Sequence, residues 1–324
     1  MLFQKTLKPL SSLVLTALLC VTLGFQTFIY HAPTAEAAAV SWTGGAVGSW
    51  ATAGNWSGAA VPTSSDDVTI DSASAILVTA GSDISFSTLT IGGAGGSNIL
   101  KLEGNITSGG SITIGNNGTL NQKNAVAQTI TGTLTINSGG ILQHEANTTA
   151  QSYILNFSAA TITVNAGGSI NVDGKGYTAG DNFAAGNGPA AGGASGGGGG
   201  HGGNGGTQGG TGGTANCDIT NPATMGSGGG GSTQAGGNGG GLIILNVTGT
   251  LTVNGTITND GTAGSTSAGG GAGGGIKITA GTIAGTPQSF TITGGTGGGS
   301  GGPGGGGGCA LMTYTNTNSI SGTS

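Results

Sequence analysis

The sequence predicts an all-β fold, a right-handed parallel β-helix with glycine-rich, polyglycine-II-like insertions in its C-terminal half. Three observations carry this prediction. A short alternating phrase recurs along the chain, glycine supplies 76 of the 324 residues, and no helical periodicity is present after residue 39. Glycine usually makes up about 7% of a protein.

The recurring phrase alternates hydroxyl-bearing and aliphatic residues, which is the period-2 pattern of a half-buried strand. It starts at Thr88, Ser111, Thr133 and Thr161, with spacings of 23, 22 and 28 residues, and again at Thr250. Each repeat of roughly 22 residues holds about three short strands separated by Asn/Gly-rich turns. Stacked repeats bury their aliphatic residues together. A β-sandwich is the competing fold, but the near-constant repeat favours a solenoid.

The hydroxyl residues of the phrase form a predicted two-column ladder on the outside of the stack. Its members are Thr88, Thr90, Thr133, Thr135, Thr161, Thr163, Thr250 and Thr252, with Ser111 and Thr113 between them. Such an array resembles the surface of β-solenoid ice-binding proteins. The simpler interpretation is that threonine suits exposed strand positions, and we prefer it because the ladder is short and interrupted.

We divide the chain into four segments. Residues 1–39 are a predicted signal peptide, with Lys5 and Lys8 before an apolar stretch and small residues at Ala37 and Ala39 for cleavage. An uncleaved membrane anchor is the alternative. Residues 40–70 are a tryptophan-rich N-terminal cap, residues 71–185 are coils of the β-helix, and residues 186–324 are its glycine-rich continuation.

The cap segment contains all three tryptophans, Trp42, Trp50 and Trp56. A solenoid needs an atypical end to cover its core, and these residues directly precede the first coil. An aromatic sugar-binding platform is the alternative.

Residues 42–70 resemble the opening segment of bacterial secreted β-helix proteins of the autotransporter and adhesin type. The resemblance rests on the Gly48-Ser49-Trp50 turn, the Asn55-Trp56-Ser57-Gly58 stretch, Pro62, and the pair Asp66-Asp67 before a first strand. It implies a β-helix and secretion, but no particular ligand. An autotransporter barrel and a known sorting motif are not recognisable in the sequence.

The glycine blocks are phased. Between Gly199 and Thr214, nearly every third residue carries a side chain. Collagen is excluded because it needs a strict G-X-Y repeat with abundant proline, and proline is rare in the blocks. A nucleotide-binding loop is excluded because the blocks lack its lysine and its strand–helix setting. A flexible linker and an ordered polyglycine-II bundle remain. We prefer the bundle, because aliphatic strands from Leu242, Ile276 and Phe290 interleave the blocks.

Cysteine chemistry is limited to Cys217 and Cys309 in the mature chain. After export they either pair as a disulfide or stay as two thiols. The sequence predicts no metal site, because there is no CxxC and both mature histidines, His144 and His201, are distant from the cysteines in sequence. No cofactor is predicted.

The charges exclude several functions. Charged residues make up 5% of the chain and arginine is absent, so nucleic-acid binding is not expected. Asp66, Asp67 and Asp71 are the one acidic group, either a calcium site or a solvated turn, and we prefer the turn. The neighbours His144 and Glu145 point to opposite faces of a strand. We therefore expect no catalytic residue and no enzyme activity.

Together these patterns predict a secreted or cell-surface structural and adhesive protein that mediates attachment or assembly of an extracellular layer or filament. The expected partners are a glycan or another cell-surface protein, with self-association through an open C-terminal coil around Tyr314. Membrane contact is expected only through an uncleaved signal segment. An ice-binding protein and, with less support, a polysaccharide-active β-helix enzyme are the alternatives.

Overall fold

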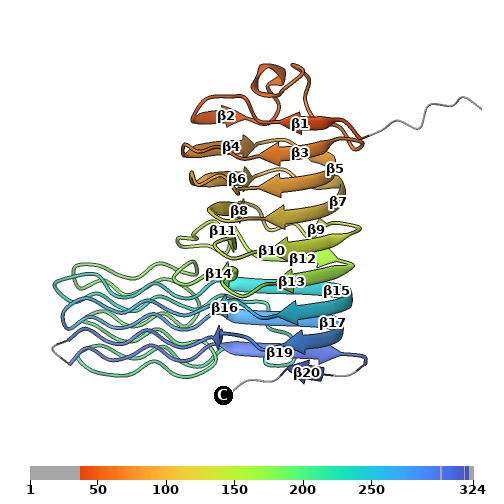
Figure 1. Ribbon diagram of the computed structural model, residues 1–324. Helices are drawn as coiled ribbons and strands as arrows, with labels where there is room; N and C mark the ends of the chain where they lie inside the picture. Colours follow the sequence, from red (N-terminus) through yellow and green to blue (C-terminus); the bar gives the residue numbers. More distant parts are fainter. Residues whose placement is uncertain (1–36, 300, 317, 321–324) are drawn as a thin grey trace, which may run out of the picture. The chain divides into compact units, whose positions relative to one another are not determined.

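The fold consists of two long parallel sheets (Figure 1). The computed structural model describes residues 37–299, 301–316 and 318–320. Within them one 3-10 helix is present, η1 (Ala53–Asn55), and every pairing between named strands is parallel. The all-β prediction is therefore confirmed. No helix of the described residues has the length and apolar character needed to cross a membrane.

The first sheet contains the recurring phrase in successive strands. Its members are β1 (Ala39–Ser41), β3 (Asp67–Ile70), β5 (Ile84–Ile91), β7 (Ile106–Ile114), β9 (Gln128–Thr129), β10 (Thr133–Ile136), β12 (Leu155–Ala159), β13 (Thr161–Val164), β15 (Leu242–Val253), β17 (Gly275–Gly285), β19 (Cys309–Tyr314) and β20 (Asn318–Ile320).

The second sheet contains the short strands that come after the first-sheet strands and their Asn/Gly-rich turns. Its members are β2 (Val47–Ser49), β4 (Ile76–Ala80), β6 (Asn98–Leu102), β8 (Gly118–Gln122), β11 (Ile141–His144), β14 (Ser169–Asn171), β16 (Thr256–Thr258) and β18 (Ser289–Thr291). The chain alternates between the two sheets, and in places two consecutive strands, such as β9 and β10 or β12 and β13, both join the first sheet.

The register gives the length of each turn. Thr69, Thr90, Thr113 and Thr135 pair in succession, and they are 21, 23 and 22 residues apart. From Thr163 onward the turns are longer, because glycine-rich segments leave the stack between its strands.

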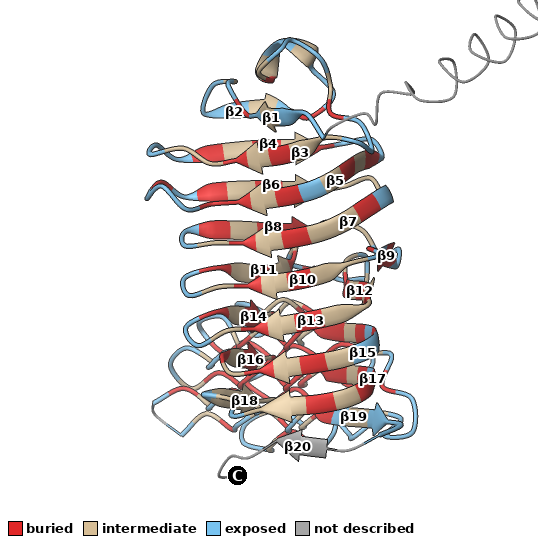
Figure 2. Cartoon of the chain, turned by 45° about the vertical axis from the view of Figure 1, so that its right-hand side comes forward, coloured by how far each residue is buried: buried red, intermediate tan, exposed pale blue. Residues whose placement is uncertain are grey.

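The core lies between the sheets. Along each strand, buried aliphatic residues alternate with half-exposed polar ones (Figure 2). Stacking then places like residues over one another, as in the inner column Ile70, Ile91, Ile114, Ile136, Val164 and Val253. These residues belong to one continuous apolar cluster from Trp42 to Ile283. Such burial is worth about 25 cal/mol per Å² of apolar surface, which is what holds the turns together.

The three tryptophans close one end of this cluster. All three are buried. Trp56 packs edge-on against Trp42 and Trp50, with ring centroids 5.1 and 4.8 Å apart, and its indole N–H donates to the Trp50 carbonyl over 2.7 Å. Their burial in the core leaves little ring surface for the alternative role as a sugar platform.

The glycine-rich segments form a layer of extended chain beside the sheets (Figure 1). We call this layer the glycine bundle; it comprises residues 172–241, 259–274, 292–299 and 301–308. The segments leave the stack after β14, β16 and β18 and return at β15, β17 and β19. Because of the first of them, Thr163 and its partner Thr252 are 89 positions apart in sequence.

Hydrogen bonding in the bundle has a period of three residues. The N–H groups of Gly270, Gly271 and Ala272 donate to carbonyls on different segments, those of Pro303, Thr262 and Ser227. Three residues later, the N–H groups of Gly273 and Gly274 donate to the carbonyls of Gly306 and Asn259. Each of these acceptors lies on the same segment as the earlier acceptor, Pro303 or Thr262, and three residues from it. Exposure follows the same period, since every third residue from Pro303 to Cys309 is buried. Backbone polar groups are thus paired rather than left unsatisfied.

The glycines are needed because neighbouring backbones touch. A Cβ on Gly271 would overlap the carbonyl oxygen of Asn238. Close approach of this kind excludes any side chain at the packed positions.

The predicted signal peptide lies almost wholly outside the described residues. The structure adds one observation about where this segment ends. β1 begins at Ala39, and the carbonyl of Ala38 accepts a hydrogen bond from the Asp67 N–H over 2.8 Å. The described residues from Ala38 onward form one compact unit.

Candidate functional site

The threonine ladder lies on the outer surface of the first sheet in two columns, which we call the threonine face. The first column is Asp67, Thr88, Ser111, Thr133, Thr161, Thr250 and Thr282; the second is Ser41, Thr69, Thr90, Thr113, Thr135, Thr163 and Thr252, followed by Ala284.

The second column carries hydroxyl groups without a break from Ser41 to Thr252. The expectation that other groups interrupt the ladder is therefore wrong: the glycine segment between β14 and β15 leaves the stack on another side and does not enter the face. Turns stack about 4.8 Å apart, and alternate residues of a strand are roughly 6.6 Å apart. The face is thus a regular grid of half-exposed hydroxyl and methyl groups, and Asp67 is its one charged member.

Asp67 is itself part of the grid. Its carboxylate accepts a hydrogen bond from the Thr88 hydroxyl over 2.7 Å. Asp66 accepts from the N–H and hydroxyl of Thr63, and Asp71 accepts from the Ala94 N–H. Each of the three carboxylates therefore accepts hydrogen bonds from different partners. They do not form a group of metal-ligand atoms among the described residues.

Charges on the second sheet are paired with one another. Lys101 contacts Glu145 over 3.2 Å, and Lys123 contacts Glu103 over 2.9 Å. The hydrogen bond and charge of Glu103 raise the pKa of Lys123. Partial burial pushes the pKa of Glu145 upward, but Lys101 and Asn121 outweigh it and hold this pKa below its ordinary value. These ions are half-exposed, so solvent screens each pair and neither contributes much to stability.

His144 is buried and structural. Its Nδ1 lies 2.7 Å from the Glu145 carbonyl, and its Nε2 accepts the N–H of Leu242 over 3.2 Å. Burial lowers its pKa to about 4. Glu145 lies at the surface, so this pair does not form a base and its orienting carboxylate.

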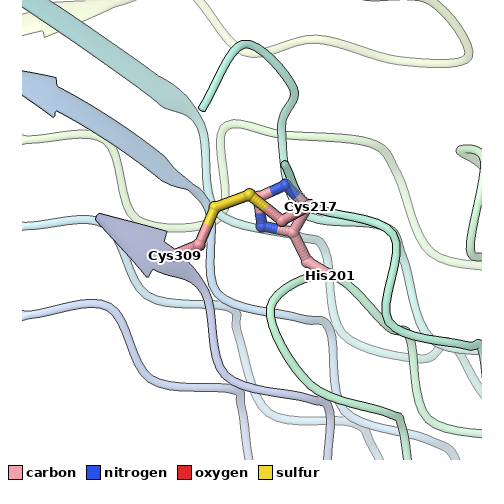
Figure 3. Close-up of side chains that lie close together, drawn as sticks. All are labelled: His201, Cys217 and Cys309. Atoms are coloured by element: carbon pink, nitrogen blue, oxygen red, sulfur yellow. A yellow bond between two sulfur atoms is a disulfide. The ribbon is translucent and has the colours of Figure 1, made fainter. Parts of the chain in front are cut away.

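Cys217 and Cys309 form a disulfide that joins the glycine bundle to β19 (Figure 3). His201 lies beside it, and one ligand atom from each of these three residues falls within 4.8 Å of the others. The inference that His201 is too distant from the cysteines in sequence to share a metal site with them is therefore wrong. The glycine bundle brings His201 next to both of them. Burial lowers the pKa of His201 against the opposing effect of nearby carbonyls.

Two hollows lie at the bend of the first sheet and share Thr248. One is lined by Thr129, Ile130, Thr131, Ser158, Ala159, Ala160 and Thr248, and the other by Asn246, Val247, Thr248, Thr279, Ala280, Gly281 and Thr315. No charged side chain lines either hollow. Sequence reasoning did not find them, because they depend on the angle at which adjoining strands meet.

In comparisons with known proteins, no family model, no curated protein and no solved structure matches this chain. Its function is therefore inferred from its own residues.

Proposed function

We propose that this chain is a secreted or cell-surface structural and adhesive protein: a right-handed parallel β-helix with a lateral polyglycine-II bundle. The observation that carries the proposal is the regular, almost uncharged hydroxyl surface on a continuous apolar core. The three-residue hydrogen-bonding period supports the polyglycine-II assignment, since that helix has three residues per turn. The resemblance of residues 42–70 to secreted adhesins points the same way.

Export is supported by the disulfide, which is stable in an oxidising compartment. Cleavage after Ala37 would retain the Ala38 carbonyl that pairs with Asp67, whereas cleavage after Ala39 would remove it. We expect the secreted chain to begin at Ala38. The intact mass of the secreted protein checks this, and a chain that retains residues 1–37 would contradict it.

The absence of enzyme activity is part of the proposal. The acids near the turns support it, since they pair backbone and hydroxyl groups of successive turns. Asp173 accepts the Asp260 N–H, and Asp260 accepts the Thr293 N–H. Carboxylates held this way act as structural acceptors.

We propose a neutral glycan as the adhesive partner. Both hollows at the bend present hydroxyl and small apolar groups without charge, and such a lining suits uncharged sugar rings. The test is retention of the mature chain on neutral and on charged polysaccharide columns. We expect retention on a neutral polymer that persists in high salt, because no ion pair contributes.

Thr248→Trp fills both hollows and should abolish that retention. Thr119→Trp, at an outward position of β8 in the second sheet, is the matched control and should retain it. Retention on charged polymers alone, or on none, would refute the glycan proposal.

Ice binding is the second candidate, favoured by the unbroken second column of the threonine face. A regular hydroxyl and methyl grid can order water against a crystal surface. Thr135→Tyr with Thr163→Tyr should abolish thermal hysteresis, whereas Thr119→Tyr with Thr256→Tyr on the second sheet should not. A mature chain without thermal hysteresis eliminates this candidate.

A further inference from the structure

The centre formed by His201, Cys217 and Cys309 has a second chemistry. We propose that reduction of the disulfide turns these three residues into a binding site for a zinc ion. Two thiolates and one imidazole are a typical donor set for zinc, and three protein ligands leave the fourth tetrahedral position open.

The placement of the three groups supports this. Their ligand atoms already lie within 4.8 Å of one another, and a tetrahedral zinc ion needs nitrogen–sulfur and sulfur–sulfur separations of roughly 3.5–3.8 Å. Once the disulfide is broken, the sulfurs have only to move apart to reach these separations. His201 and Cys309 are buried, while Cys217 is half-exposed and gives a reductant and the ion a route in.

The histidine has a ring nitrogen available. Its Nε2 lies 3.0 Å from the Thr224 hydroxyl, while its Nδ1 is buried and has no hydrogen-bond partner. A buried polar atom without a partner requires an explanation, and an ion bound at Nδ1 provides one. Thr224 would then orient the ring from the opposite side, as second-shell partners of zinc-bound histidines do.

The chemistry balances with a dithiol as the reductant. A dithiol transfers two electrons and two protons to the Cys217–Cys309 bond, which opens to two thiols, and the dithiol becomes a disulfide. Binding of Zn²⁺ then releases the two thiol protons. The glycine bundle is thereby fastened to β19 in both redox states, by a disulfide under oxidising conditions and by zinc under reducing ones.

The test uses Co²⁺ as a spectroscopic probe on the mature chain, reduced with a phosphine without oxygen. We expect one Co²⁺ per reduced chain, with thiolate-to-cobalt charge-transfer and tetrahedral d–d bands that Zn²⁺ removes. The oxidised chain has the same sequence and is the matched control; it should show no such bands. His201→Gln should weaken the affinity about tenfold or more, and Cys217→Ser should abolish the bands.

X-ray absorption of the zinc-loaded wild-type chain keeps the test independent of how the variants fold. It should show two sulfurs at about 2.3 Å and a nitrogen at about 2.0 Å. Absence of charge-transfer bands from the reduced chain, equal cobalt binding by the oxidised chain, or a shell without sulfur would each overturn the proposal.

Discussion

His144 shows how a single buried residue couples this fold to pH. It lies where the chain returns from the glycine bundle to β15, and its Nε2 accepts the Leu242 N–H. Burial keeps it neutral by lowering its pKa from 6.5 to about 4. Protonation would remove the acceptor and place a charge in the core.

The unfolded chain binds the proton more readily than the folded one, so stability falls as the pH drops from about 6.5 to about 4. The loss is about 3 kcal/mol, since each pKa unit corresponds to about 1.4 kcal/mol. Urea unfolding of wild type and His144→Gln across this range measures it. The variant should lack this part of the pH dependence, although buried His201 contributes in the same direction in both proteins.

NMR titration of the His144 ring in the folded wild type gives a second measurement that needs no variant. A pKa near 6.5 would contradict the prediction.

The sequence predicted the environment of some single residues and not of others. Alternation predicted that His144 and Glu145 point to opposite faces, and the structure buries His144 while Glu145 stays half-exposed. It could not show that Asn259, wholly buried, donates to the Gly241 and Gly275 carbonyls, because those contacts join segments that meet only in the folded stack.

At the scale of elements, the glycine bundle depends on which residues face a neighbouring segment. Gly271 is buried, and a Cβ there would overlap the Asn238 carbonyl. Gly307 is exposed, and a Cβ there would lie 4.0 Å from its nearest neighbour, the Ile292 carbonyl oxygen. The two positions are therefore a matched pair within one bundle.

Gly271→Ala should lower the free energy of unfolding by about 1–3 kcal/mol, the usual cost of overpacking. Gly307→Ala should be neutral or stabilise by up to about 1 kcal/mol, because alanine restricts the unfolded chain. Chemical unfolding of both variants checks this. Equal, negligible effects would show that these segments behave as a flexible linker.

The strands of the first sheet were largely predictable as elements. The Thr-x-Thr phrases carry a local pattern, and their alternation determines which side chains point outward. The phasing of the glycine blocks also indicated a three-residue period. Packing between distant residues decides which segment accepts the hydrogen bond of Gly270 and which accepts that of Gly271. No local sequence pattern records this choice.

For the whole molecule, the disulfide is the covalent link between the glycine bundle and the last turns of the first sheet. It closes a loop with a sequence separation of 92 residues. Cys217→Ala with Cys309→Ala should cost about 2–4 kcal/mol, chiefly because the unfolded chain gains freedom.

Hydrogen–deuterium exchange should locate the effect. Protection should fall in residues 186–241, while residues 84–136 keep theirs, since repeats in a stack interact mainly with their neighbours. Loss of protection spread evenly over both regions would contradict this distribution.

By itself, the sequence determined the all-β class, the alternation of buried and exposed residues, the spacing of the early turns and the side on which the threonines lie. These properties follow from local backbone preferences and from a period of two, which any stretch of a few residues reveals. The tertiary structure alone decided that the threonine face is unbroken across the 89-residue step from Thr163 to Thr252, and that His201 lies beside Cys217 and Cys309. Both depend on where a long glycine segment leaves and rejoins the stack, which is settled by the packing free energy of the whole assembly of turns rather than by any one of them.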